Sequence, residues 1–123
     1  QDAVRPFVSV KKIVESINAC QNFGAAILAV PPKETIKEAK AGYVDNTPSR
    51  DRIWSVQTPQ VFKYDLLYKA YMNAFECGVY QTDDSALVER LGYPVKIVEG
   101  EYQNIKITVP FDLKLAELIL KAE

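Results

Sequence analysis

Apolar residues recur at spacings of three and four along several stretches of the chain, which is the spacing of one face of a helix. The expected helices cover residues 10–22, 66–77, 82–91 and 111–121. Residues suited to capping or ending a helix flank these stretches: Ser9, Asp65 and Thr82 at the starts, Pro110 in the first turn of the last helix, and Gly24, Gly78 and Gly92 after the ends.

Shorter apolar runs predict the strands. Residues 25–30 form a continuous apolar run that ends at a pair of prolines, which is typical of a strand covered on both faces. Two further strands are expected over residues 95–98 and 105–109, with a polar turn between them. Because strands and helices alternate, the pattern predicts one domain with an α/β layer fold and a largely parallel sheet.

Residues 33–54 do not follow either pattern. Short extended pieces at 35–37 and 43–44 lie among polar turns that contain Gly42, Asn46 and Pro48. We interpret this stretch as a protruding hairpin, an arm that adds little to the core. An ordinary exposed loop is the alternative that composition leaves open.

Composition excludes several classes of protein. The chain has 123 residues, 48% of them hydrophobic, so it can build a core without metal or disulfide bridges. Fifteen basic and sixteen acidic residues nearly cancel, and no basic footprint for nucleic acid or an anionic membrane is present. No apolar run approaches the roughly 20 residues of a membrane span, and no signal-peptide pattern occurs. We therefore expect a soluble, cytoplasmic protein.

Cysteine and histidine usage narrows the chemistry. Cys20 and Cys77 lie far apart in helical stretches, so we expect buried, reduced thiols. Histidine is absent, which removes Ser-His and Cys-His nucleophiles and the usual zinc ligands. Any chemistry must depend on Asp, Glu, Lys, Arg or Thr side chains or on groups of the substrate.

Three charged residues are candidates for a ligand site, since ligands of α/β sheets gather at the carboxyl ends of strands. Asp2 can face a metal or ligand hydroxyls, and Arg5 can bind a phosphate or hold its own loop together; a local ion pair between them is an equal alternative. Lys106 alternates with Ile105 and Ile107, so it points away from the face that those two bury. It can place a charge on a phosphate, or it can be a solvated strand lysine.

Two polar motifs have both a structural and a functional interpretation. In Gln-Thr-Pro-Gln at 57–60, a kink before Pro59 can aim Thr58 at a ligand, or the motif is only a turn. In Thr-Asp-Asp-Ser at 82–85, Thr82 can cap a helix whose dipole suits the two acids, which we favour over a cation site.

These motifs occur in one order along the chain: Asp-Ala-Val-Arg-Pro at 2–6, Glu-Thr-Ile-Lys at 34–37, Arg50, Gln-Thr-Pro-Gln at 57–60, Thr-Asp-Asp-Ser at 82–85 and Asn-Ile-Lys-Ile-Thr at 104–108. The ordered set resembles the 2-C-methyl-D-erythritol 4-phosphate cytidylyltransferases. The resemblance implies a Rossmann-like nucleotidyltransferase fold with a protruding β-arm, and a homodimer joined through interlocked arms. It also implies Mg²⁺-dependent transfer of CMP from CTP to methylerythritol phosphate with release of pyrophosphate.

The resemblance further implies roles for individual residues. Arg50 and Lys106 would hold the substrate phosphate for in-line attack on the α-phosphorus, and Thr35 and Thr58 would help to bind that substrate. Asp2 would face the ribose, the substrate hydroxyls or the magnesium ion. Because Thr35 and Arg50 lie in the arm, they would complete the site of the other subunit. The nucleophile is already an anion, which agrees with the absence of histidine.

The chain departs from the family pattern in two ways. Family members carry a glycine-rich, basic loop for the CTP triphosphate near their N-terminus, and no such loop occurs in these 123 residues. A histidine commonly precedes the loop aspartate, where this chain has Gln1. We interpret residues 1–123 as the C-terminal portion of one cytidylyltransferase domain, incomplete and inactive alone.

Two other functions stay open. Ribitol-5-phosphate cytidylyltransferases share the N-terminal loop and the Asn-Ile-Lys element, although Thr-Asp-Asp-Ser at 82–85 and Ile53-Trp54 favour the methylerythritol branch. A non-catalytic dimerisation module that kept the fold and the arm is the alternative from another class.

Overall fold

The computed structural model describes residues 5–80 and 83–122. Asp2 and Thr82, to which the sequence assigned roles, therefore lie outside the described residues. The elements follow in the order α1 (Val10–Phe23), β1 (Ala25–Val30), β2 (Glu38–Lys40), β3 (Tyr43–Asn46), the 3₁₀ turn η1 (Arg50–Arg52), β4 (Ser55–Phe62), α2 (Tyr64–Cys77), α3 (Asp84–Arg90), β5 (Lys96–Glu99) and α4 (Pro110–Ala122).

A three-stranded sheet in the order β4-β1-β5 forms the centre of the fold. β1 lies parallel to β5 and antiparallel to β4, so the prediction of a largely parallel sheet is wrong for one of these two pairings. β4 itself was not predicted. Polar residues and Pro59 interrupt its alternation, which made this stretch resemble a turn.

The pairing of β4 with β1 contains an irregular bulge. Ile27 pairs with Gln60 and Ala29 pairs with Val56, so three residues of β4, 57–59, lie opposite a single residue of β1. The Thr58-Pro59 peptide bond within it is cis. A bulge bends its strand and changes the direction of its side chains. The kink predicted at 57–60 is therefore present, but it lies within a strand and not in a turn.

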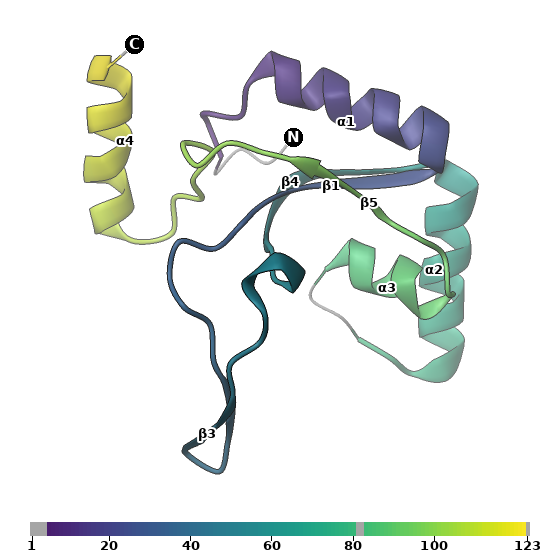
Figure 1. The fold of residues 1–123 in the computed structure, drawn as a ribbon. Coiled ribbons are helices and arrows are strands. Elements are labelled where there is room, and N and C mark those ends of the chain that lie inside the picture. Colours follow the sequence, from purple (N-terminus) through teal and green to yellow (C-terminus); the bar gives the residue numbers. More distant parts are fainter. Residues whose placement is uncertain (1–4, 81–82, 123) are drawn as a thin grey trace.

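Helices cover both faces of this sheet (Figure 1): α1 lies on one face, and α2 with α3 lies on the other. All six residues of β1 are buried, as its continuous apolar run predicts. Small residues of α2 approach the sheet closely, and Ala25, Ala70, Ala74, Leu87 and Val88 form one buried cluster. At about 25 cal/mol per Å² of apolar surface removed from water, such burial is the main stabilising term of the fold.

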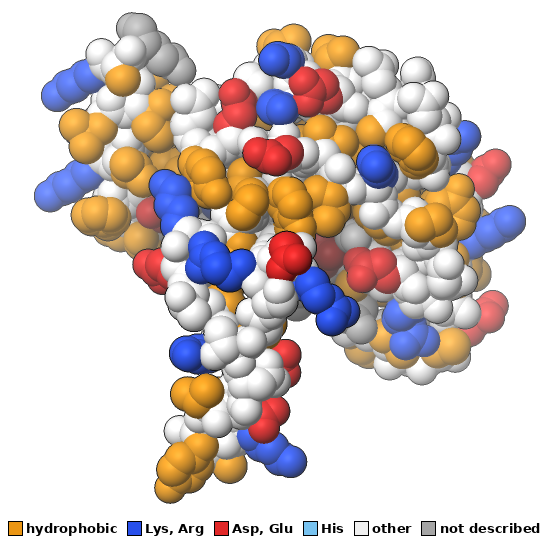
Figure 2. Space-filling model, in the orientation of Figure 1, with side chains coloured by type: hydrophobic (Ala, Val, Ile, Leu, Met, Phe, Trp, Pro, Cys, Tyr) orange, Lys and Arg blue, Asp and Glu red, His pale blue; other side chains and the backbone are white. Residues whose placement is uncertain are grey.

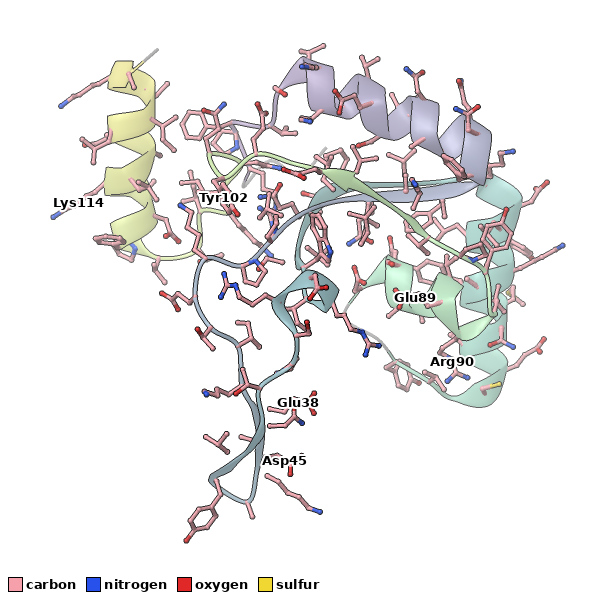
Figure 3. All side chains as sticks on the ribbon, viewed as in Figure 1. Glu38, Asp45, Glu89, Arg90, Tyr102 and Lys114 are labelled. Carbon is pink, nitrogen blue, oxygen red and sulfur yellow. The ribbon has the colours of Figure 1, made fainter. Side chains whose placement is uncertain are left out.

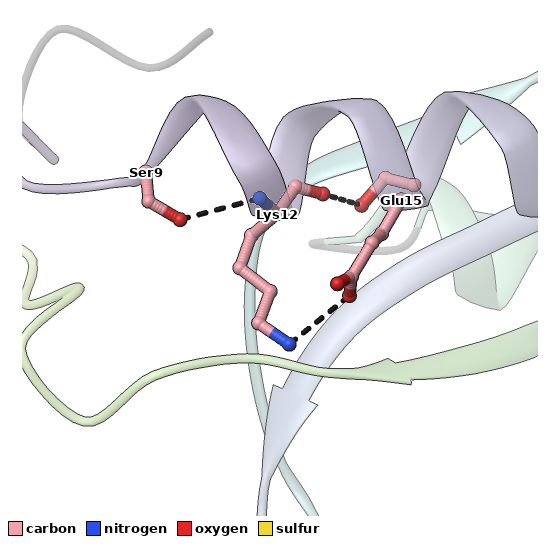
Figure 4. Close-up of polar contacts among 4 residues, drawn as sticks. Ser9, Lys12 and Glu15 are labelled. Atoms are coloured by element: carbon pink, nitrogen blue, oxygen red, sulfur yellow. Dashed lines mark hydrogen bonds and ion pairs between the residues drawn. The ribbon is translucent and has the colours of Figure 1, made fainter.

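The ends of α1 agree with the sequence. The Ser9 hydroxyl oxygen accepts a 3.2 Å hydrogen bond from the Lys12 amide, and Lys12 also pairs with Glu15 at 3.0 Å (Figure 4). Gly24 ends the helix with a φ of 89°. A Cβ on Gly24 would also overlap the hydroxyl of Tyr93. Glycine is therefore required here for both its conformation and its size.

The starts of α2 and α3 differ from the prediction. Lys63 occupies the N-cap of α2, and Asp65 lies in its first turn, where its charge still suits the helix dipole. α3 begins at Asp84, and the side chain of Asp83 caps it by accepting from the amide of Ala86 at 3.2 Å. Gly78 follows α2 with a φ of 65°, as predicted.

The predicted arm is a two-stranded hairpin of β2 and β3 that projects from the body (Figure 1). Its first strand covers Glu38–Lys40 and not residues 35–37. Ala41 and Gly42 form its turn with φ values of 52° and 84°, the left-handed conformation that a two-residue hairpin loop needs. Every residue of both strands is exposed, so the arm adds nothing to the core.

Residues 105–109 do not form the predicted strand. The amides of Thr108 and Val109 donate instead to the carboxylate of Asp112, at 3.0 and 3.1 Å, and so they are unavailable to a sheet. These hydrogen bonds lower the pKa of Asp112, the one from the Thr108 amide most strongly. α4 then begins at Pro110, as the sequence predicts.

α4 stands apart from the layered body in Figure 1, and Figure 2 shows apolar side chains on its surface and at the tip of the arm. Phe111 and Leu118 are among the exposed residues of α4, and Tyr43 and Val44 are exposed at the arm tip. Within the described residues, no helix combines the length and the apolar character that a membrane span requires.

Both cysteines are free. Cys20 is buried as predicted, and burial raises the pKa of its thiol, which lies 3.6 Å from the carbonyl oxygen of Gly24. Cys77 is exposed, so the prediction of a second buried thiol is wrong. Cys77 is the last residue of α2 and lies about one turn beyond Ala74, the last buried residue of that helix.

Candidate functional site

A buried amide lies at the centre of the candidate site. Asn104 is 2% exposed, and its Nδ2 donates to Gln57 Oε1 at 3.1 Å and to the carbonyl oxygen of Thr58 at 3.0 Å. Both acceptors belong to the bulge of β4. The side chain of Asn104 therefore ties the loop after β5 to the irregular part of the sheet.

Gln57 makes a second contact between the bulge and the loop after β5. Its side chain is 7% exposed, and Nε2 donates to the carbonyl oxygen of Glu101 at 3.0 Å. Gly100 allows this approach, because a Cβ there would lie 2.5 Å from Gln57 Oε1. The amide of Gly100 continues the sheet by donating to Ala29 at 2.9 Å. Gln57 thus spans the start of the loop while Asn104 holds its middle.

Arg5 joins the same network from the N-terminal loop. Its Nη1 donates to the carbonyl oxygen of Asn104 at 2.8 Å. Arg5 therefore connects the N-terminal loop to the loop of Lys106. Its two predicted roles, binding a phosphate and holding its own loop together, stay predictions. The alternative ion pair with Asp2 lies outside the described residues.

Lys106 follows Asn104 by two residues. It is exposed, whereas Ile105 and Ile107 are half-buried, so it has the predicted orientation without the predicted strand. Within residues 5–80 and 83–122, its ammonium group has no hydrogen bond or ion pair. A lysine in this state can offer its charge to an anion in solution.

Thr58 takes part through its backbone. Its carbonyl oxygen accepts from Asn104, and its hydroxyl oxygen is enclosed with no hydrogen-bond partner among the described residues. Asn104 Oδ1 is likewise enclosed and has no hydrogen-bond partner among the described residues. The predicted contact of the Thr58 hydroxyl with a substrate stays a prediction.

Arg50 lies at the base of the arm. Its Nη2 donates to the carbonyl oxygen of Pro32 at 2.7 Å, and Nη1 lies 3.4 Å from the carbonyl oxygen of Glu34. A guanidinium has five N–H donors, so these contacts fix its position and leave donors for a ligand. Thr35, the other candidate in the arm, is exposed next to this contact.

Tyr102 connects the base of the arm with the loop of Lys106. Its hydroxyl donates to the carbonyl oxygen of Pro31 at 2.7 Å, and Lys33 Nζ lies 4.6 Å from the centre of its ring. Figure 3 shows Tyr102 between these two segments. A groove of about 330 Å³ runs along this junction and is lined by Pro32, Ile36 and Tyr102, among others.

The structure brings together some candidate residues and not others. One hydrogen-bonded network contains Arg5, the backbone of Thr58 and Asn104, which lies two residues before Lys106. Arg50 and Thr35 are on a separate segment that reaches this network through Tyr102. In the described part of the chain, neither Arg50 nor Thr35 forms a hydrogen bond to Thr58 or Lys106.

The acidic motif has the structural role that the sequence favoured. Gln60 donates to the carboxylate of Asp83 and accepts from the amide of Ser85 at 3.1 Å. Asp84 accepts from the hydroxyl of Tyr71, which raises the pKa of that tyrosine. The motif therefore fastens the start of α3 to β4 and to α2.

No metal centre is evident from side chains alone. The described residues contain no group of three or more Cys, Asp or Glu side chains placed to hold a metal. The carboxylate predicted to face magnesium, that of Asp2, lies outside them.

Gln57 and Asn104 were not predicted as site residues. Both were noted as members of motifs, but an amide in a polar motif has no spacing signal that distinguishes a buried network from an exposed loop. One sequence feature could have indicated this network. Gly100 lies at the end of a predicted strand and before a polar turn, and a glycine in such a place can allow another segment of the chain to approach closely.

Comparison with known proteins places this geometry in a family. The sequence model of the family described as IspD, 2-C-methyl-D-erythritol 4-phosphate cytidylyltransferase, matches residues 1–122. A protein of that name from Desulforamulus reducens is 53% identical over 121 residues, which cover 98% of this chain and 52% of the relative. Its counterpart from Geobacillus kaustophilus is 50% identical over 119 residues, covering 97% and 52%.

Solved structures agree with these relatives. The 4-diphosphocytidyl-2C-methyl-D-erythritol synthase from Anaerococcus prevotii superposes with a TM-score of 0.92 at 40% identity, covering 98% of this chain and 55% of that one. The cytidylyltransferase from Thermus thermophilus gives 0.86 at 39% identity, covering 98% and 60%. The predicted nucleotidyltransferase fold is confirmed. The chain belongs to the 2-C-methyl-D-erythritol 4-phosphate cytidylyltransferase family, and it spans about half the length of the curated relatives it matches.

Proposed function

We propose that the protein containing this chain transfers CMP from CTP to 2-C-methyl-D-erythritol 4-phosphate and releases pyrophosphate. Family membership supports this reaction, since relatives that are 53% and 50% identical to the chain are named 2-C-methyl-D-erythritol 4-phosphate cytidylyltransferase. The observation on the molecule that supports it best is the network of Arg5, Gln57 and Asn104, two residues before Lys106, a lysine that has no hydrogen bond or ion pair among the described residues. The contribution of this chain is the site for the alcohol phosphate.

The reaction needs positioned charge and no general base. A phosphate oxygen of methylerythritol phosphate forms a bond to the α-phosphorus of CTP, while the bond from that phosphorus to the bridging oxygen breaks and pyrophosphate leaves. With a second pKa near 6, the phosphate is largely a dianion at neutral pH. Catalysis therefore consists of orienting this anion and stabilising the charge of the transition state.

Lys106 and Arg50 supply this charge in the proposal. The ammonium of Lys106 acts as a point charge, and Arg50 offers a planar guanidinium that suits two phosphate oxygens. Arg50 donates two hydrogen bonds to carbonyl groups at the base of the arm, those of Pro32 and Glu34, and these contacts fix the direction of its side chain. Thr35 and Thr58 would contribute hydroxyls to the same substrate.

A divalent cation, Mg²⁺ or a similar ion, is part of the proposal, with Asp2 as its predicted ligand. When bound, it would neutralise the charge that develops on the phosphates. Nucleic acid is not an expected partner, because the chain has no net basic charge. A cytoplasmic location stays a prediction.

The arm supports a second part of the proposal, a homodimer. The hairpin is exposed along its whole length and ends in exposed Tyr43 and Val44, so its apolar tip has surface available for a second copy. In such a dimer, Arg50 and Thr35 would complete the site of the other subunit. Sedimentation of the protein with and without residues 37–47 tests this: equal dimerisation after the deletion would remove the arm from the interface.

The test of function is a pyrophosphate-release assay of the protein that the whole gene encodes, here called the gene-encoded protein. CTP is supplied with methylerythritol phosphate and, in parallel, with ribitol 5-phosphate. We expect turnover with the first alcohol only. Turnover with ribitol 5-phosphate alone would indicate a ribitol-5-phosphate cytidylyltransferase. Turnover with neither alcohol would favour a non-catalytic dimerisation module.

The 123-residue chain provides a second test. Its sequence has no glycine-rich, basic loop for a triphosphate, and such loops supply most of the oxyanion donors of a nucleotide site. Pyrophosphate release by these residues alone should therefore stay at background. Turnover by a sample whose intact mass excludes additional residues would contradict this expectation.

A further inference from the structure

The loop after β5 carries Lys106 but has little backbone support. Among the described residues, the amide of Gly100 donates to the carbonyl oxygen of Ala29, and the other backbone hydrogen bonds of residues 101–105 are internal turns, from Asn104 to Glu101 at 3.1 Å and from Ile105 to Gln103 at 2.8 Å. Turns of this kind shape a loop but do not attach it to the sheet. Within the part of the chain that the structure describes, side chains attach this loop to the rest of the fold.

Two amide side chains attach the loop to the bulge of β4. Gln57 and Asn104 share the 3.1 Å bond from Nδ2 to Oε1, and each also bonds a backbone carbonyl of the opposite segment, Glu101 for Gln57 and Thr58 for Asn104. The pair thus forms a cross-brace between the bulge of β4 and the loop. Both side chains are more than nine-tenths buried, so water does not compete for these hydrogen bonds.

The cross-brace also extends to the N-terminal loop, because the carbonyl oxygen of Asn104 accepts from Arg5. Neither amide has its nitrogen exposed to a ligand: both donate within the protein. Their effect on a phosphate must be indirect, through the direction in which Lys106 is presented.

We propose that Gln57 and Asn104 are positioning residues for the alcohol phosphate, and that they act through Lys106. This inference rests on the proposed function. Misplacing a catalytic group by about 1 Å can cost about a hundredfold in rate, so a brace of this kind has a large effect without touching the substrate. In this proposal the bulge of β4 contributes to positioning Lys106, because it directs Gln57 and the carbonyl group of Thr58 towards the loop.

The test is a double-mutant cycle in the gene-encoded protein, with Asn104→Ala, Lys106→Ala and the combination. Asn104→Ala should lower kcat/KM for methylerythritol phosphate by about ten- to a hundredfold, with KM for CTP changed less than about threefold. In the Lys106→Ala background, the same substitution should cost less than about threefold, because the group that it positions is gone. Gln103→Ala is the matched control, since its exposed side chain lies next to Asn104.

A purely structural role predicts a different result: Asn104→Ala would then impair both substrates alike, and its effect would multiply with that of Lys106→Ala. That outcome in an active enzyme would overturn the positioning role and leave the proposed function intact. A wild-type protein without turnover would overturn the proposed function and this inference with it. If Asn104→Ala lowers the Tm below the assay temperature, Gln57→Met, which removes the other amide but keeps its length, takes its place in the cycle.

Discussion

The hydroxyl of Tyr102 donates a 2.7 Å hydrogen bond to the carbonyl oxygen of Pro31, so the loop that carries Lys106 is fastened to the point where the arm leaves the sheet. The ring of the same tyrosine lies under the ammonium of Lys33. The base of the arm is therefore in contact with this loop on both sides of Pro32.

Tyr102→Phe tests this connection, because it removes the hydrogen bond and keeps the ring. We expect faster hydrogen exchange of amides at 33–36, with global stability changed by about 1 kcal/mol or less for the loss of one partly exposed hydrogen bond. Tyr102→Ala, which also removes the ring beneath Lys33, should have the larger effect. Unchanged exchange in both variants would show that the arm is held by other contacts.

Arg50→Ala and Lys106→Ala should each weaken use of the alcohol phosphate. Loss of a charge-assisted hydrogen bond costs about 1.5–3 kcal/mol, or roughly ten- to a hundredfold in kcat/KM. The kinetic constants for CTP should change little. Lys114→Ala is the control, since Lys114 extends from α4 away from the body of the molecule (Figure 3). An equal loss in this control would point to net charge as the cause.

Mixed dimers test whether Arg50 acts across the interface. If it does, a heterodimer of an Arg50→Ala subunit and a Lys106→Ala subunit has one site with both cations and one with neither. Activity should then rise towards half that of the wild-type dimer. Heterodimers that form but stay at the level of their parents would place Arg50 in the site of its own subunit.

Gly24→Ala should destabilise the protein more than Gly78→Ala. Both glycines have positive φ, at 89° and 65°, which costs a side chain about 1–2 kcal/mol. Only at Gly24 does a Cβ also meet a neighbour, the hydroxyl of Tyr93, and overpacking adds about 1–3 kcal/mol. Urea unfolding measures the difference, and adding Tyr93→Phe should recover part of it. No recovery would assign the whole cost to the backbone.

Asp112→Asn should destabilise α4 at neutral pH only. The pKa of Asp112 is lowered from 3.8 by amide hydrogen bonds, so its contribution is present above about pH 3.8 and is lost as the pH falls through the lower folded pKa. Helix content of wild type and variant, followed by circular dichroism from pH 7 to about pH 2, should differ at first and then converge. A difference that persists in acid would mean that the negative charge is not responsible.

The two thiols should differ in reactivity at neutral pH. Cys77 is exposed, while burial raises the pKa of Cys20 and keeps it protonated. A thiol reagent should therefore modify one cysteine quickly, and Cys77→Ser should abolish the fast phase. A fast phase that survives this substitution would mean that the region around Cys20 opens readily.

The sequence predicted those elements whose ends carry a local signal. α1 lies between Ser9 and Gly24 as expected, and β1 is buried throughout because its apolar run leaves no polar face. β4 was missed because polar residues and Pro59 break its alternation, and only pairing with β1 makes it a strand. For residues 105–109 the error was the opposite, because a strand was predicted and none forms. An apolar alternation does not make a strand unless a neighbouring strand is available to pair with it.

The roles predicted for the charged residues of the candidate site stay predictions. The structure shows that Arg5 contacts the loop of Lys106, through the carbonyl oxygen of Asn104. Gln57 and Asn104 were not predicted, because their hydrogen bonds join positions 47 residues apart and depend on a bulge that no local pattern indicates.

The bulge of β4 also constrains which lengths of this strand are permissible. Because Ile27 pairs with Gln60 and Ala29 with Val56, β4 has two residues more than β1 between these pairs. Gln57 and Thr58, which supply the acceptors of Asn104, lie within this longer segment. Deleting two residues from 57–59 would restore one-to-one pairing of the strands and remove the segment that reaches the loop. Substitutions here change a contact, whereas a change in length removes the segment that makes it.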